Sequence, residues 1–220
     1  MVIAIDGPAG SGKSTTARMV AKRLGFLYLD TGAMYRALTL KALRERLDLE
    51  NEEALGILAD RTQVALVQRD EGLQTLLDGE DVSEEIRLPE VTAKIAPVCR
   101  VPRVREVLVQ RQREIGQAAG DVVMEGRDIG TVVFPDAQLK IFLDAGVEER
   151  ARRRFGELAK QGIEAHLEDV KRDMLERDQR DMEREHGPLR RAKDVVVVDT
   201  THLTIAEQVD RIVRLARENG

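Results

Sequence analysis

The chain has 220 residues, of which 42% are apolar and 34% are charged, and its formal net charge at pH 7 is -5. These values fit a globular protein with one sizeable core and room for a smaller lobe, and they exclude a disordered chain. The acidic net charge argues against broad, nonspecific binding to nucleic acid.

The first predicted elements are a strand over residues 2–5 and a helix over 16–24, and a glycine-rich turn joins them. Its residues match every fixed position of the P-loop pattern G-x-x-x-x-G-K-[ST]; they are Gly7, Pro8, Ala9, Gly10, Ser11, Gly12, Lys13, Ser14 and Thr15. Backbone N–H groups in such a turn and at the following helix N-terminus converge on phosphate. We therefore expect a nucleoside triphosphate here, with Lys13 on its β- and γ-phosphates and Ser14 on a bound Mg²⁺. An ordinary glycine turn is the alternative.

A second short strand, 26–29, ends at Asp30 and is followed by a predicted helix over 33–45. Tyr35 and Arg36 lie on its first turn, near the carboxyl end of the strand, where open α/β sheets bind ligands. They are candidates for an acceptor site. From spacing alone, a packed tyrosine and a solvated arginine are equally good interpretations.

The next part of the chain interrupts the alternation of strands and helices. A helix start is predicted at 51–53, and 64–68 and 73–77 read as two strands joined by a turn over 69–72. This hairpin predicts an insertion or second lobe over roughly 59–97. Pro89 and Pro102 are each placed to open a helix.

A buried strand is predicted over 121–125, and it leads into a glycine-bounded turn at 126–130. Glu125, Arg127 and Asp128 therefore place both signs of charge at the ligand-binding edge of a parallel sheet. A turn held by an Arg-Asp ion pair is the alternative. A further strand follows over 139–144, and Gly146 begins an arginine-rich helix.

The predicted helix over 167–185 carries Arg177, Asp181 and Arg184 at spacing i, i+4 and i+7, which puts them on one face. A solvated face of ion pairs explains this spacing well by itself. The last elements are a valine-rich strand over 195–199 and an amphipathic helix over 204–218.

Cysteine usage and the N-terminal residues bear on the compartment. The single cysteine, Cys99, forms no internal disulfide and is expected to be a small buried hydrophobe. Met1 leads directly into a strand, and no stretch reaches membrane-spanning length. We expect a soluble, cytoplasmic protein without membrane or nucleic-acid partners.

Five motifs are spread over nearly the whole chain. They are the P-loop 7–15, Asp-Thr-Gly-Ala-Met-Tyr-Arg at 30–36, Val-Ser-Glu-Glu-Ile-Arg at 82–87, Glu-Gly-Arg-Asp-Ile-Gly-Thr-Val-Val-Phe-Pro at 125–135, and Glu-Arg-Asp-Gln-Arg-Asp at 176–181. In this combination and order they resemble the bacterial cytidylate kinases. The P-loop alone is shared by a very large superfamily. The four other motifs make the combination far more restrictive.

The resemblance implies an α/β chain with the P-loop nucleoside monophosphate kinase fold. Its core would hold a five-stranded parallel sheet flanked by helices, from segments 1–30, 98–150 and 190–220. An acceptor-binding lobe would span 31–97, with the hairpin insertion at 59–97, and a short lid would span 151–189. A monomer is expected.

The resemblance also assigns roles to matching residues, with ATP and CMP or dCMP as substrates and Mg²⁺ as cofactor. The expected acceptor site consists of Thr31, Tyr35, Arg36, Arg105, Arg127, Asp128, Arg177, Asp181 and Arg184. Within it, Tyr35 lies beside the sugar, Arg36, Arg127 and Arg184 bind phosphates, Arg177 and Asp181 bind ribose, and Arg105 and Asp128 contact cytosine. The expected catalytic residues are Lys13, Arg127, Arg180 and Arg184, and Arg154 is expected beside ATP. From its position after the strand that precedes the Gly-Arg-Asp turn, Glu125 is expected to orient water on Mg²⁺; a structural partner for a nearby arginine is the alternative.

One position departs from the family pattern, because Ala96 stands where a base-contacting serine is often found. The missing hydroxyl removes one hydrogen bond, worth about 0.5–1.5 kcal/mol net. We hypothesise that cytosine remains preferred and binds modestly more weakly.

Two rival functions remain open at this stage. Another small P-loop kinase, acting on UMP, AMP or a non-nucleotide acid, would share the core but is not expected to share the insertion and the turn at 126–128. A GTPase-type switch would need a guanine-reading Asn-Lys-x-Asp element, and the sequence contains none.

Overall fold

The computed structural model describes residues 1–69, 72–160 and 162–219. Its main sheet is parallel, with strand order β2-β6-β1-β7-β8. The strands are β1 (Val2–Asp6), β2 (Leu27–Asp30), β6 (Val122–Gly126), β7 (Leu139–Asp144) and β8 (Val196–Asp199). The five-stranded parallel sheet expected from the resemblance is therefore confirmed.

The central strands of this sheet are buried on both faces. In β1, Ile3, Ala4 and Ile5 are all fully buried, as a continuous apolar run in a parallel sheet predicts. Helices cover the two faces; they are α1 (Lys13–Leu24), α6 (Pro102–Ala119) and α9 (Ile205–Asn219). The amphipathic closing helix α9 packs Val209, Ile212 and Val213 into the core beside β1 and β7.

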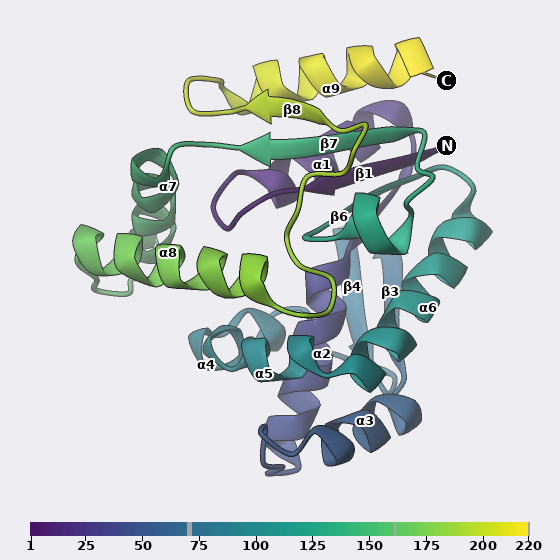
Figure 1. The fold of residues 1–220 in the computed structure, drawn as a ribbon, viewed down its shortest axis with the longest axis vertical. Helices are drawn as coiled ribbons and strands as arrows, with labels where there is room; N and C mark the ends of the chain where they lie inside the picture. Colours follow the sequence, from purple (N-terminus) through teal and green to yellow (C-terminus); the bar gives the residue numbers. More distant parts are fainter. Residues whose placement is uncertain (70–71, 161, 220) are drawn as a thin grey trace.

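A second lobe lies beneath the main sheet in Figure 1. It contains α2 (Thr31–Arg44), α3 (Glu52–Arg61), α4 (Pro89–Ala93), α5 (Ile95–Arg100), the 3-10 helix η1 (Glu85–Arg87), and an antiparallel sheet of β3 (Val64–Arg69), β4 (Gly72–Leu77) and β5 (Glu80–Asp81). The hairpin predicted from sequence is present and gains β5 as a third strand. Residues 70 and 71 of its predicted turn lie outside the described residues.

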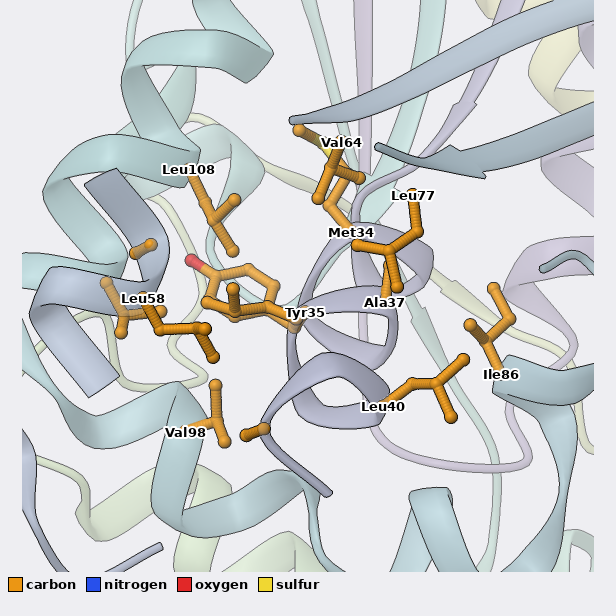
Figure 2. Close-up of a cluster of buried hydrophobic side chains, with 14 of the residues drawn as sticks. Met34, Tyr35, Ala37, Leu40, Leu58, Val64, Leu77, Ile86, Val98 and Leu108 are labelled. Atoms are coloured by element: carbon orange, nitrogen blue, oxygen red, sulfur yellow. The ribbon is translucent and has the colours of Figure 1, made fainter. Parts of the chain in front are cut away.

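Helix α2 links this lobe to the main sheet. Asp30 ends β2 and caps α2, because its side chain accepts a hydrogen bond from the Ala33 amide at 3.0 Å. Figure 2 shows Met34 and Tyr35 pointing from α2 to different sides, Met34 toward Val64 and Leu77 of the hairpin and Tyr35 toward the α6 residue Leu108. The helix is therefore held from both sides by the lobe core.

The helices predicted at Asn51, Pro89 and Pro102 begin where their sequences indicate. The Asn51 side chain accepts a hydrogen bond from the Ala54 amide at 3.0 Å and caps α3. Pro89 and Pro102 occupy the first turns of α4 and α6, where a missing N–H leaves no lost hydrogen bond.

Two helices pack against each other beside the P-loop, at the carboxyl end of β7 (Figure 1). They are α7 (Val147–Lys160) and α8 (Leu167–Glu183). Ala151 of α7 and Val170 and Met174 of α8 form a small buried cluster between them. Within the part of the chain that the structure describes, no helix has both the length and the apolar composition needed to cross a membrane.

Candidate active site

Register brings the carboxyl ends of three strands together. Asp30 of β2 is opposite Glu125 of β6, and Gly126 is opposite Asp6 of β1. The P-loop leaves β1 at Asp6, α2 leaves β2 at Asp30, and the turn with Arg127 and Asp128 leaves β6. Three motifs that are distant in sequence therefore meet at one edge of the sheet, as the sequence predicted.

The P-loop has the strand-turn-helix context that its pattern requires. Gly7 has φ +151° and a Cβ there would overlap the Leu143 carbonyl, so only glycine fits. Lys13 is buried and its Nζ donates to the Pro8 carbonyl at 2.7 Å. Burial and the neighbouring Arg127 lower the pKa of Lys13 to about 7. An anion in the loop would therefore restore the favourable charged state of this lysine.

Glu125 lies close to the P-loop helix and is almost fully buried. Burial and the nearby Asp30 raise its pKa, while Lys13 and hydrogen bonds from Tyr28 and Ser14 oppose that shift. Tyr28 Oη donates to Glu125 Oε1 at 2.5 Å. A hydroxyl and carboxylates are the hard oxygen donors that Mg²⁺ prefers, so Ser14 and Glu125 fit the expected metal position. Tyr28 was not predicted from sequence.

Asp6 holds the turn that follows β6. Its two carboxylate oxygens accept hydrogen bonds from the amides of Ile129 at 2.9 Å and Gly130 at 2.8 Å. These amides open the π-helix η2 (Ile129–Val133) directly after Asp128. Burial raises the pKa of Asp6 to about 6, although the two amides act in the opposite direction. One carboxylate thus fixes the turn relative to the P-loop, a role that the sequence did not reveal.

Two guanidinium groups at this edge of the sheet pair with carboxylates. Arg127 Nε donates to Asp181 Oδ2 at 2.8 Å, and Arg36 Nη2 donates to Asp30 Oδ2 at 2.8 Å. Arg36 Nε is buried with no hydrogen-bond partner among the described residues. Arg36 therefore carries unmet donor capacity beside Asp30, which is the pattern of an anion site.

Arg177 lies near Lys13 and Arg127, and these three residues form a cation cluster. Across residues 1–69, 72–160 and 162–219, Arg177 makes no ion pair within 4.0 Å. Burial and the like charge of Arg127 lower the pKa of Arg177 to about 10. Repulsion among these cations destabilises the free site, so a polyanion would be bound with a large electrostatic gain.

Arg105 and Asp128 form a buried ion pair at the far side of the site. Arg105 also donates to Tyr35 Oη at 3.4 Å and lies 6.0 Å from the centre of its ring. Arg184 Nη2 lies 3.6 Å from Asp128 Oδ1. Asp128 is therefore held by an ion pair, as the alternative interpretation of the turn expected, but its partner is Arg105, whereas Arg127 pairs with Asp181.

Arg184 corrects one detail of the sequence analysis. The helix α8 ends at Glu183, and Arg184 has the extended backbone angle ψ 140°. It therefore does not share a helix face with Arg177 and Asp181. It reaches Asp128 because the chain turns inward, where Arg184 Nε donates to the Gly187 carbonyl.

Three predicted site residues make other contacts in this structure. Arg154 is half-buried and pairs with Glu157 at 3.0 Å, and Arg180 is exposed and donates to the Glu176 carbonyl of its own helix at 3.1 Å. The buried Thr31 hydroxyl donates to the Glu125 carbonyl at 2.7 Å. Arg154 and Arg180 therefore do not join the cation cluster, whereas Thr31 lies at the carboxyl end of the strands.

A family model described as cytidylate kinase matches residues 3–218. The chain belongs to the cytidylate kinase family. The cytidylate kinase of Caldanaerobacter subterraneus subsp. tengcongensis is 51% identical over 217 residues, which are 99% of this chain and 95% of that protein. The cytidylate kinase of Desulforamulus reducens is 54% identical over 211 residues, which are 96% of this chain and 94% of that protein.

A crystal structure of an uncharacterized protein from Eubacterium ventriosum has a TM-score of 0.54 with this cytidylate kinase family member. The match covers 99% of this chain and 98% of that chain at 11% sequence identity. This likeness shows a shared fold.

Replacing Gly187 with Ala should lower kcat/KM for CMP by at least about tenfold. Gly187 has φ +60°, and a Cβ there would overlap the Arg105 guanidinium and the Asp128 carboxylate. The matched control is Gly162→Ala, where φ is +72° and nothing lies within 4 Å of the added Cβ. Steady-state kinetics that give equal effects for the two variants would contradict the assigned position of Gly187.

Binding of Mg-ATP to the free protein should weaken as pH rises from about 7 to about 9. Lys13, with its pKa lowered to about 7, loses its proton over this range, while the bound phosphates favour the protonated form. Loss of one proton changes Kd by at most about tenfold per pH unit. Calorimetry in buffers of different ionisation enthalpy should detect proton uptake at about pH 8. The control is Lys22→Met, because Lys22 is exposed on α1 and its replacement should leave the proton uptake unchanged. Absence of proton uptake by the unmodified protein would refute the lowered pKa of Lys13.

Proposed function

We propose that the chain transfers the γ-phosphate of ATP to CMP or dCMP, giving ADP and CDP or dCDP. The observation that carries this proposal is the cluster of Lys13, Arg127 and Arg177, in which Lys13 is buried and both arginines are half-buried. The positive charge of this cluster could be balanced by the negative charge of two phosphorylated groups. The family membership supports the same reaction.

The chemistry requires alignment and charge stabilisation more than proton transfer. An ionised phosphate oxygen of CMP attacks the γ-phosphorus, an O–P bond forms, and the bond to the bridging β–γ oxygen breaks with its electron pair on ADP. The nucleophile is already an anion, so no strong general base is needed. His166, His186 and His202 are exposed, in agreement with this expectation.

The donor half of the site is proposed to be the P-loop. Its backbone amides and Lys13 would hold the triphosphate, while Ser14 and Glu125 would hold Mg²⁺, Glu125 through water. When bound, Mg²⁺ neutralises charge on the triphosphate oxygens. The hydrogen bond from Tyr28 fixes the Glu125 carboxylate in place.

The acceptor half is proposed to be the cation cluster together with the Arg105–Asp128 pair. Arg36, Arg127 and Arg184 would bind the phosphate, and Arg177 and Asp181 the ribose. Cytosine presents an amino donor and ring acceptors, which match a carboxylate and a guanidinium. Uracil presents the reverse pattern toward Asp128, so CMP is favoured over UMP. Ala96 would weaken the base contact modestly.

The division of the chain and its cellular setting are part of the same proposal. We assign 1–30, 98–150 and 190–220 to the core, 31–97 to the acceptor lobe and 151–189 to the lid. Arg154 and Arg180 would approach ATP only if the lid moves relative to its present position. We also propose a cytoplasmic monomer that acts on small molecules, and the acidic net charge supports the absence of nucleic-acid partners.

Substrate profiling with Mg-ATP should give the highest kcat/KM with CMP or dCMP, at least about tenfold above UMP, because the reversed hydrogen-bond pattern costs about 1.5 kcal/mol or more. Rates should be measured as ADP formation, with the diphosphate product identified by chromatography. AMP and a mixture without acceptor complete the set.

The matched variant for this profile is Asp128→Asn, whose amide can donate to uracil and should narrow the CMP-to-UMP ratio. A preference for UMP or AMP would defeat the proposed specificity. ADP formation that does not depend on an acceptor would defeat the kinase assignment and favour a nucleotide hydrolase.

A further inference from the structure

Two buried charges next to the P-loop have no role in the reaction as proposed above. Arg150 of α7 and Asp178 of α8 form an ion pair, and only 6% of Arg150 and 4% of Asp178 are exposed. Burying charged groups is costly unless geometry and hydrogen bonds satisfy both partners. The contacts of this pair show what it holds.

Both partners bind the same P-loop residue. The Ala9 amide donates to Asp178 Oδ1 at 3.2 Å, and Arg150 Nη1 donates to the Ala9 carbonyl at 3.0 Å. Arg150 Nε also donates to the Ala145 carbonyl at 3.0 Å, at the end of β7. The donor and the acceptor of one P-loop residue are therefore fixed by side chains from two different helices.

Packing reinforces these hydrogen bonds. Ala9 packs against the buried cluster of Ala151, Val170 and Met174 between α7 and α8. At the next residue, a Cβ on Gly10 would lie 2.7 Å from Met174 Cε, so the loop and the helices are in close contact. The shape of the P-loop at residues 9–10 thus depends on where α7 and α8 lie.

The same helix also carries acceptor-site residues. Arg177 directly precedes Asp178, and Asp181, three residues further on, pairs with Arg127 at 2.8 Å. Because α8 is one continuous helix, any movement that seats Arg177 and Asp181 on an acceptor also moves the carboxylate that holds Ala9.

We propose that Arg150 and Asp178 are positioning residues that clamp Ala9 and couple the triphosphate loop to the seating of α8. The clamp sets the geometry of the P-loop, and acceptor binding on α8 strengthens it, so that the two substrates bind with positive cooperativity. This coupling rests on the proposed function. It also discourages transfer of the γ-phosphate to water, because the clamp on the loop is strongest when the acceptor is in place.

Calorimetric titration tests the coupling directly. Mg²⁺ with a non-hydrolysable ATP analogue is titrated into the protein with and without saturating CMP, and the ratio of the two Kd values is the coupling factor. In the unmodified protein this factor should be about fivefold or more. In Asp178→Asn it should fall to near 1, and the affinity for the analogue alone should also weaken.

The matched control is Asp173→Asn, on the same helix with the same change of charge, because Asp173 is exposed. It should keep the coupling factor of the unmodified protein. A second variant, Arg150→Met with Asp178→Leu, replaces the pair by apolar side chains of similar size, a change that generally preserves folding. It should remain folded by circular dichroism and lose the coupling, which a purely structural pair would not do.

The outcomes separate this inference from the proposed function. If the unmodified protein shows no coupling, or Asp178→Asn retains it, the clamp is refuted. If the protein binds no CMP, the proposed function fails. The affinities of the variants for the ATP analogue then test the clamp by themselves. Weaker analogue binding by Asp178→Asn than by Asp173→Asn would uphold the positioning of Ala9, and equal binding would refute it.

Discussion

Mutual repulsion among neighbouring cations is the constraint on which this site depends. Lys13, Arg127 and Arg177 lie close enough to repel one another, and the shifts in the pKa values of Lys13 and Arg177 reflect burial together with the like charge of Arg127. Such an arrangement persists only because the surrounding fold holds it, and its charges are satisfied best by phosphorylated substrates. The parallel sheet meets this need by ending three strands at one edge, where Asp30 and Glu125 provide nearby negative charge.

Local chemistry made much of the fold predictable from the sequence. The P-loop depends on nine consecutive residues, so its turn and the following helix are encoded in one short segment. Asn51 and Pro102 mark helix starts through their own backbone preferences. The strands read as apolar runs because both faces of the sheet are covered. Because Glu125 and Asp128 come at the end of such an apolar run, they could be placed at the carboxyl end of a strand from the sequence alone.

The partners of the site residues could not be predicted, because register and helix packing decide them. Tyr28 and Asp178 are ordinary residues in sequence, and only the fold brings Tyr28 to Glu125 and Asp178 to Ala9. Spacing likewise gave no basis for separating the half-buried Arg177 from the exposed Arg180, or for seeing that the helix ends before Arg184. Gly187 had no motif of its own, although it packs directly on the Arg105–Asp128 pair.

The central claim is that the clustered cations bind the acceptor through its phosphate. Calorimetric binding of CMP and of cytidine to the unmodified protein, Arg127→Met and Arg172→Met tests it most directly, because Arg172 is an exposed arginine on α8 that pairs with Asp169. Arg127→Met should weaken CMP binding by about tenfold or more while leaving cytidine unchanged, since a charge-assisted contact to phosphate is worth about 1.5–3 kcal/mol. Arg172→Met should change neither. Equal loss of CMP and cytidine binding in Arg127→Met, or no loss of CMP binding, would contradict the account.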